Sequence, residues 1–176
     1  MKRLSLLRHA KSGWDDPVAR DFDRPLNPRG RRAARAVGER MKKEGLGFDL
    51  VLASPARRVV ETLEEVEATF GPLDACYEKR IYLASTETLL DLVHQASDSA
   101  VRLLLVGHNP GFERLALLLT GPGKLRSRVE AKYPTGSLAE INLPVKQWRD
   151  VGEGEGVLER FIRPRDLDPE LGPEES

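Results

Sequence analysis

The chain has 176 residues, of which 40% are hydrophobic and 32% charged, and its formal net charge is zero. This length and composition predict one compact domain with an apolar core, and they exclude a fibrous or largely disordered protein. Residues 1–60 hold 15 basic against 7 acidic side chains. Zero net charge argues against general nucleic-acid binding, while the basic first third could supply a site for an anionic ligand.

Cysteine and histidine are too sparse and too scattered to predict a disulfide or a metal site. Cys76 is the single cysteine, and the three histidines do not have the spacing of zinc ligands. The apolar run Leu4 to Leu7 is interrupted by Arg8 and His9, so it is not a signal peptide, and no segment suggests a membrane span. We expect a cytoplasmic protein without metal or other cofactor that contacts neither nucleic acid nor membrane. Its oligomeric state stays open, with a monomer plausible.

Three short apolar runs, at residues 4–7, 48–53 and 101–107, lack polar alternation. Such runs are typical of strands that are buried on both faces, as in the centre of a parallel sheet. Residues 75–78 predict a further short strand. Segments 137–143 and 157–162 alternate weakly and predict antiparallel edge strands.

Helices are predicted between these strands by apolar residues at helical spacing. They cover residues 27–45, 54–70, 86–96 and 109–121, and Asn27, Ser54 and Asn109 are each a capping residue followed by proline. Alternating strands and helices predict a three-layer α/β/α sandwich with a mostly parallel sheet and antiparallel strands near the C-terminus. We assign residues 1–163 to this domain and expect the acidic segment 164–176 to be disordered.

Polar residues directly follow the predicted central strands. Ligand sites of open α/β sheets lie beyond the carboxyl ends of the strands. The residues at those positions are Arg8 with His9, the segment 54–57, and His108 with Asn109. Arg57 also falls in the first turn of a predicted helix, where backbone N–H groups favour an anion. We therefore expect two histidines and two arginines to meet at one edge of the sheet.

These residue types suit phosphoryl transfer. Arginine forms bidentate hydrogen bonds to phosphate and remains protonated. A neutral imidazole is a good nucleophile at neutral pH, and a second imidazole can donate hydrogen bonds to the transferred group. Taken alone, His9 or His108 is more often a structural histidine, but with Arg8 and Arg57 at matched strand ends we favour a phosphate site. His94, inside a predicted helix, keeps the structural interpretation.

The segment Leu7-Arg8-His9-Ala10 resembles the Arg-His-Gly signature of the histidine phosphatase superfamily, which has the phosphoglycerate-mutase-like fold. Further blocks agree with it at residues 23–26, 54–62 and 106–111, so that the resemblance covers about residues 2–143. The short chain is similar to the small single-domain subgroup typified by phosphohistidine phosphatases. The resemblance implies that His9 is the nucleophile and that Arg8, Arg57 and His108 complete the phosphate pocket.

Two further residues are candidate phosphate contacts, Arg24 and Asn109, although Arg24 could equally be a structural ion-pair residue. Ala10 replaces the glycine of the signature, a departure that we expect to be harmless. A second departure concerns the general acid, because no carboxylate occurs at residues 80–84, where many relatives place one after the third strand. Glu87 and Asp15, with its neighbour Asp16, are the alternative acids, but acidic residues near a helix start are usually capping charges.

The resulting hypothesis is a metal-independent phosphatase that acts on phosphohistidine in a protein. Phosphohistidine suits a site without a general acid, because protonated phosphohistidine releases a neutral imidazole that needs no further proton. Three alternatives stay open: a phosphatase of small phosphate monoesters, a phosphate-binding interaction module without turnover, and a mutase. The mutase is the least favoured of these, because mutases of this fold enclose their substrate under inserted segments for which this chain has no room.

Overall fold

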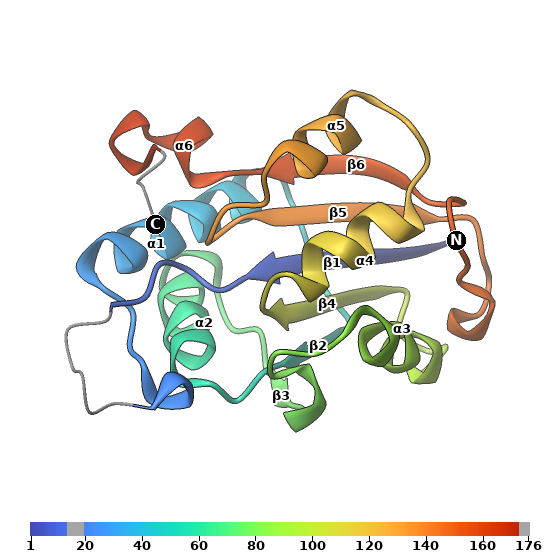
Figure 1. Cartoon of the computed structure of the whole chain (residues 1–176), viewed down its shortest axis with the longest axis horizontal. Helices are drawn as coiled ribbons and strands as arrows, with labels where there is room; N and C mark the ends of the chain where they lie inside the picture. Colours follow the sequence, from blue (N-terminus) through green and yellow to red (C-terminus); the bar gives the residue numbers. More distant parts are fainter. Residues whose placement is uncertain (14–19, 173–176) are drawn as a thin grey trace.

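The computed structural model describes residues 1–13 and 20–172, which form one six-stranded mixed sheet between two layers of helices (Figure 1). The strand order is β3-β2-β4-β1-β5-β6. The first four of these strands in that order are parallel, and β5 and β6 are each antiparallel to the strand before. The strand bounds are β1 Lys2–Arg8, β2 Leu50–Ala53, β3 Cys76–Tyr77, β4 Arg102–Gly107, β5 Leu138–Leu143 and β6 Val157–Ile162.

In the described part of the chain, six α-helices accompany the sheet: α1 Pro28–Lys43, α2 Arg57–Phe70, α3 Thr86–Gln95, α4 Gly111–Leu119, α5 Lys124–Ala131 and α6 Pro164–Leu167. Short 3₁₀ turns lie at Asp21–Asp23, Lys79–Ile81, Trp148–Asp150 and Pro169–Leu171. The Asn27 side chain accepts a hydrogen bond from Gly30 N–H and so caps α1 as expected. Within the described ranges, no helix is both long and apolar enough to cross a membrane.

The sheet separates two apolar cores, because successive residues of a strand point to opposite faces. In β1, Leu4 and Leu6 pack with α3, α4 and α5, whereas Leu7 packs with α1 and α2 on the other face. In β4, Leu105 and Val106 divide in the same way. This two-sided burial explains why apolar residues occur on both faces of both strands. It confirms the predicted three-layer fold with its largely parallel centre and antiparallel C-terminal strands.

The prediction of a disordered tail from Pro164 is wrong for residues 164–172. Pro164 and Leu171 are buried, and the segment packs along α1, where Arg32 forms ion pairs with Asp168 and Glu170. The acidic composition of this segment therefore reflects pairing with the basic helix α1, and its apolar residues find a place in the fold. Residues 173–176 lie outside the described part of the chain.

Candidate active site

The two histidines of the site lie on neighbouring strands. Parallel pairing of β1 with β4 sets Arg8 opposite Gly107, so that His9 and His108 leave the sheet side by side. The backbone N–H of His9 donates to the Gly107 carbonyl at 2.9 Å, and the imidazole centroids are 5.3 Å apart. Both side chains are buried. The two histidines thus lie together at the carboxyl edge of the sheet, as the sequence predicts.

The orientation of His9 leaves one ring nitrogen available. Nδ1 lies 2.7 Å from the carbonyl oxygen of Ala10, which can only accept, so Nδ1 carries the proton and Nε2 is unprotonated, with its lone pair toward Arg58. Burial lowers the pKa of His9 well below its usual range, and the charges of Arg8 and Arg58 act in the same direction. His9 is therefore a neutral imidazole at neutral pH, with Nε2 as its nucleophilic atom.

Ala10 takes part in holding the nucleophile. Its backbone N–H donates to Thr62 Oγ1 of α2 at 2.9 Å, and the same hydroxyl donates to the Arg58 carbonyl at 2.7 Å. The methyl group of Ala10 is fully buried in the core beneath α1 and α2. The structure thus accommodates alanine at the position of the signature glycine.

Arg58 is the arginine that joins the two imidazoles, and the sequence interpretation missed it. Its Nε lies 3.4 Å from His9 Nε2 and its Nη2 lies 3.3 Å from His108 Nδ1. The side chain is 2% exposed. A guanidinium in this position can hold the oxygens of a phosphoryl group that is attached to, or about to meet, His9 Nε2.

The prediction that Arg57 lies in the phosphate pocket is wrong. Its side chain is 56% exposed and pairs with Glu61 Oε2 at 3.0 Å, one turn along α2. Helix α2 begins at Arg57, not at Ser54, and each residue turns the side chain by about 100°. Arg58 stands four residues before Thr62, so both side chains lie on the buried face of the helix. The side chain of Arg57 lies on the solvent-exposed side. That helical phase was the signal in the sequence that could have identified Arg58.

Asp21 anchors Arg58 from a segment that no motif had singled out. Its backbone oxygen accepts from Arg58 Nη1 at 2.7 Å and its Oδ2 accepts from Arg58 Nη2 at 3.1 Å. Tyr82 Oη donates to the same carboxylate at 2.5 Å, and Arg24 donates to Oδ1 through two nitrogens. Arg24, a candidate phosphate contact, thus holds Asp21 and also Ser12 Oγ.

The pKa of Asp21 follows from these contacts. Burial alone would raise it, but the hydrogen bond from Tyr82, the charge of Arg58 and the hydrogen bonds from Arg24 and Arg58 together lower the pKa to about 2. Asp21 is therefore a carboxylate at neutral pH. It can position Arg58, but it has no proton to give to a leaving group.

His108 faces Ser54 on its other side. Its Nε2 lies 2.8 Å from Ser54 Oγ, while its Nδ1 accepts from Arg58. Burial and the charge of Arg58 lower the pKa of His108 to about 3. Tyr82 packs edge-on against the imidazole with ring centroids 5.4 Å apart. Ser54 therefore orients His108 and does not cap α2 with its side chain.

Arg8 completes the site, held by the segment that follows α5. Its Nη1 donates to the Tyr133 carbonyl at 2.9 Å, whereas its buried Nε has no hydrogen-bond partner among the described residues. Burial lowers the pKa of this guanidinium. Asn109 donates to the same Tyr133 carbonyl and accepts from Glu113 N–H at the start of α4. Asn109 thus has a structural role in addition to any contact with phosphate.

Of the carboxylates expected as general acids, only Glu87 lies in the described part of the chain, and it is not among the residues that surround His9. Glu87 is exposed in the first turn of α3, and Asp15 and Asp16 lie outside the described residues. Glu113 of α4, which the sequence interpretation did not consider, acts electrostatically on Arg8. His94 bonds the Val151 carbonyl through Nε2, as a structural histidine would. In residues 1–13 and 20–172, no three His, Cys, Asp or Glu side chains cluster as metal ligands do.

We call His9, His108, Arg58 and Arg8 the His9 site. It combines an unprotonated imidazole nitrogen with two guanidinium groups in a largely buried place. Such an arrangement can attack a phosphorus atom and stabilise the negative charge on the phosphoryl oxygens during transfer.

Comparisons with known proteins agree with this geometry. The histidine phosphatase superfamily (branch 1) matches at residues 4–81. A protein of Mycobacterium tuberculosis without assigned activity is 34% identical over 163 residues, covering 90% of this chain and all of its own length. The crystal structure of a protein assigned as phosphohistidine phosphatase SixA from Agrobacterium tumefaciens has 31% identity and a TM-score of 0.80, and the alignment covers 93% of this chain and 98% of that one. Another protein so assigned, from Nakamurella multipartita, has 26% identity and a TM-score of 0.78, with 93% and 96% covered.

Proposed function

Since the chain belongs to the histidine phosphatase superfamily, we propose that it is a phosphatase that hydrolyses phosphohistidine on a protein through a phosphoryl group carried by His9. The observation that carries the proposal is the hydrogen bond from His9 Nδ1 to the Ala10 carbonyl, which leaves Nε2 unprotonated beside Arg58.

In the first step, His9 Nε2 attacks the phosphorus atom, and the bond from phosphorus to the substrate nitrogen breaks. Arg58 and Arg8 bind the phosphoryl oxygens as their charge shifts. In the second step, a water oxygen attacks the same phosphorus atom and the bond to Nε2 breaks. Inorganic phosphate leaves with one proton of the water, the other passes to solvent, and His9 returns to its neutral state.

The choice of substrate rests on the leaving group. A serine phosphate must expel an alkoxide, which needs a proton as it departs. Asp21, the carboxylate in contact with Arg58, is held ionised by Tyr82, Arg24 and Arg58. Phosphohistidine protonated on its other ring nitrogen leaves as a neutral imidazole and needs no acid from the enzyme. The assignment of the A. tumefaciens protein supports the same substrate.

Three measurements test the proposal. Alkaline quenching during turnover should trap an acid-labile phosphoryl group on His9, found by mass spectrometry and missing in His9→Ala. A substrate panel should give kcat/KM for a phosphohistidine peptide at least about tenfold above that for the phosphoserine peptide and for sugar phosphates, equivalent to about 1.4 kcal/mol. Activity should persist in a chelator.

The competing functions give other results. If the parent enzyme prefers monoesters, and monoester hydrolysis is lost in Glu113→Gln, Glu87→Gln or Asp15→Asn, the protein is a monoester phosphatase that uses a carboxylic acid as its general acid. A parent that binds the phosphopeptide but never turns it over would be a binding module. If the His9→Ala variant still hydrolyses the substrate, His9 is not the nucleophile and the proposal is wrong.

A further inference from the structure

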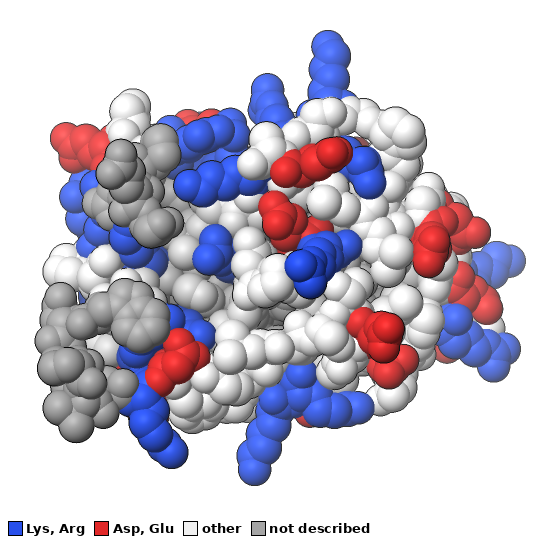
Figure 2. Space-filling model, in the orientation of Figure 1, with Lys and Arg blue, Asp and Glu red and all other residues white. Residues whose placement is uncertain are grey.

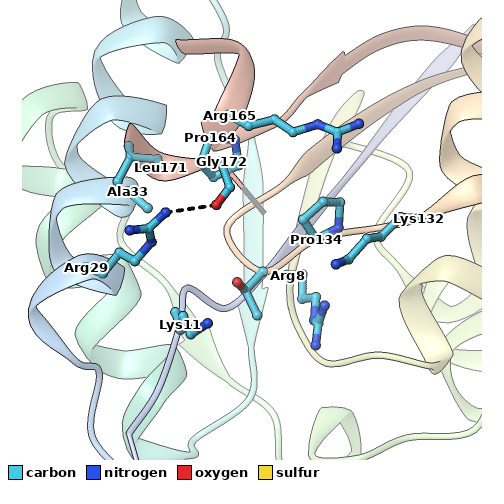
Figure 3. Close-up of a pocket in the computed structure, with 11 residues that line it drawn as sticks. Arg8, Lys11, Arg29, Ala33, Lys132, Pro134, Pro164, Arg165, Leu171 and Gly172 are labelled. Atoms are coloured by element: carbon cyan, nitrogen blue, oxygen red, sulfur yellow. Dashed lines mark hydrogen bonds between the residues drawn. The ribbon is translucent and has the colours of Figure 1, made fainter. Parts of the chain in front are cut away.

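A second hollow, which we call the basic pocket, opens beside the His9 site (Figure 3). It lies between the start of α1, the segment 132–135 before β5, and the C-terminal segment at α6. Its volume is about 120 Å³, against about 30 Å³ for a water molecule in the liquid. A carboxylate or phosphate group fits such a space.

The lining of the basic pocket is strongly cationic. Its charged residues are Arg8, Lys11, Arg29, Lys132 and Arg165, and within residues 1–13 and 20–172 no Asp or Glu lines it. The side chains enter from separate segments of the chain (Figure 3). Figure 2 shows a gathering of Lys and Arg at the upper left of the molecule, beside α1 and α6. Cations brought together from separate segments repel one another, so an anionic ligand is favoured between them.

The acidic residues that the structure describes in the C-terminal segment form their ion pairs with arginines outside the pocket lining. Asp166, next to Arg165 in sequence, bonds Arg163 through both oxygens, and Asp168 and Glu170 pair with Arg32. Arg29 donates to the Gly172 carbonyl, a neutral acceptor.

Two of the cations are left without an acceptor. Among the residues that the structure describes, the side chains of Lys132 and Arg165 make no hydrogen bond and no ion pair. The buried Nε of Arg8 likewise lacks a partner. The side chain of Lys132 is exposed and that of Arg165 is half-buried, so both are accessible to an anion, and a buried donor such as Arg8 Nε is normally satisfied, which points to a ligand.

The basic pocket shares one residue with the His9 site, because Arg8 lines the pocket and also belongs to the site. A short backbone link ties the two together. Gly136 N–H donates to the carbonyls of Arg8 and His9, and Gly136 lies against Pro164 of the pocket wall. The φ angle of Gly136 is +76°, in the region that favours glycine, so another residue type at this position would strain the turn.

We infer that the basic pocket binds a second anionic group of the substrate, a carboxylate or phosphate, while the phosphoryl group to be removed lies at His9. The inference rests on the proposed function. For a protein substrate, the second group is an acidic side chain close in sequence to the phosphohistidine. Lys132 and Arg165 are the residues that recognise it, and Arg8 spans both groups.

The test compares matched phosphohistidine peptides that carry Glu or Gln at one position, from one to four residues on either side of the phosphohistidine. At the preferred position, the parent should have a KM about tenfold lower for the Glu peptide, and the difference should shrink as salt is added. In Lys132→Gln/Arg165→Gln, the ratio of the two KM values should approach one. Lys146→Gln, an exposed lysine at the opposite edge of the sheet, is the matched control and should keep the parent ratio.

A second arm separates this inference from the proposed activity. His9→Ala lacks the nucleophile, and calorimetry with the same two peptides measures affinity without turnover. If phosphohistidine is never hydrolysed but the Glu peptide still binds more tightly, the proposed function fails and the pocket assignment stands. Equal KM and equal Kd for the two peptides, or a preference that survives in the double variant, overturns the pocket assignment. Small phosphate esters with and without a carboxylate form a third pair, and a preference confined to them identifies a metabolite as the source of the second anion.

Discussion

Arg58 donates to both the backbone oxygen and the carboxylate of Asp21, at 2.7 and 3.1 Å, so the guanidinium is fixed before any phosphate arrives. The planar group then has its Nε edge toward His9 and its Nη2 toward His108. A donor that is already in place needs no reorganisation during the reaction, which is how such groups stabilise a transition state most effectively.

Replacement of Arg58 by lysine should therefore cost far more than replacement of its neighbour. Lysine keeps the charge but loses the fork that contacts Asp21 and both imidazoles, so kcat/KM for Arg58→Lys should fall at least about a hundredfold. Arg57→Lys changes an exposed ion pair and should stay within about twofold of the parent. Steady-state kinetics on the two variants measures the contrast, and a larger loss in Arg57→Lys would contradict this account of the site.

Asp21 should act as a positioning residue. Asp21→Asn removes the charge that holds Arg58 and accepts from Tyr82, and the loss of a charge-assisted hydrogen bond is worth about 1.5–3 kcal/mol. We expect kcat/KM to fall about 10–100-fold. Tyr82→Phe keeps the carboxylate of Asp21, so its kcat/KM should fall less. An Asp21→Asn enzyme with parent kinetics would show that Arg58 needs no anchor.

Thr62 offers a stability test with a matched control. Thr62→Val leaves the buried Ala10 N–H without an acceptor and should lower the free energy of unfolding by about 1–3 kcal/mol. Thr120 is also buried and also donates to a carbonyl one helical turn back, at the same 2.7 Å. Its hydroxyl accepts no backbone N–H in the described structure, so Thr120→Val should cost less. Urea denaturation of both variants measures the difference, and equal losses would mean that the Ala10 contact is unimportant.

The low pKa of His108 predicts how stability changes with pH. The unfolded chain binds a proton at this residue below about pH 6.5, whereas the folded protein does not until about pH 3, so acidification favours the unfolded state. Between pH 6.5 and 5 this residue should lower the free energy of unfolding by about 2 kcal/mol. Asp21, with a pKa of about 2, acts only at lower pH.

Denaturation of the parent and of His108→Gln at pH 7.5, 6 and 5 isolates that contribution. The variant is expected to be less stable at every pH, but its stability should decline less steeply on acidification. Parallel curves for the two proteins would refute the neutral, buried state of His108.

Sequence reasoning succeeded where a signal was local. The positions of His9 and His108 followed from apolar strands that end at these residues, since parallel strands share their carboxyl edge. The choice between Arg57 and Arg58 depended on the first residue of α2, and a cap assigned at Ser54 was two residues too early, since the helix is preceded by Ala56. Helix boundaries depend on tertiary contacts, here the bond between Ser54 and His108, which the local pattern does not contain.

The remaining features depend on long-range contacts. Asp21 meets Arg58 and Tyr82 across 37 and 61 positions of sequence, and nothing in its own neighbourhood marks it. Helix α5 was missed because only Val129 of its residues is buried, which gives too weak an apolar pattern. The C-terminal segment has an acidic composition typical of disorder, but the basic surface of α1 supplies its partners.

The pairing of β1 with β4 has a consequence for refolding. Arg3 lies opposite Arg102, so the strand that delivers His9 reaches its neighbour only after about a hundred residues have folded back upon the start of the chain. Contacts of such high sequence separation form slowly, because the loop between them must close first. Secondary structure of the first seventy residues can thus return before any catalysis does. Recovery of phosphatase activity after dilution from denaturant should report completion of the central sheet, and no fragment that ends before His108 should recover it.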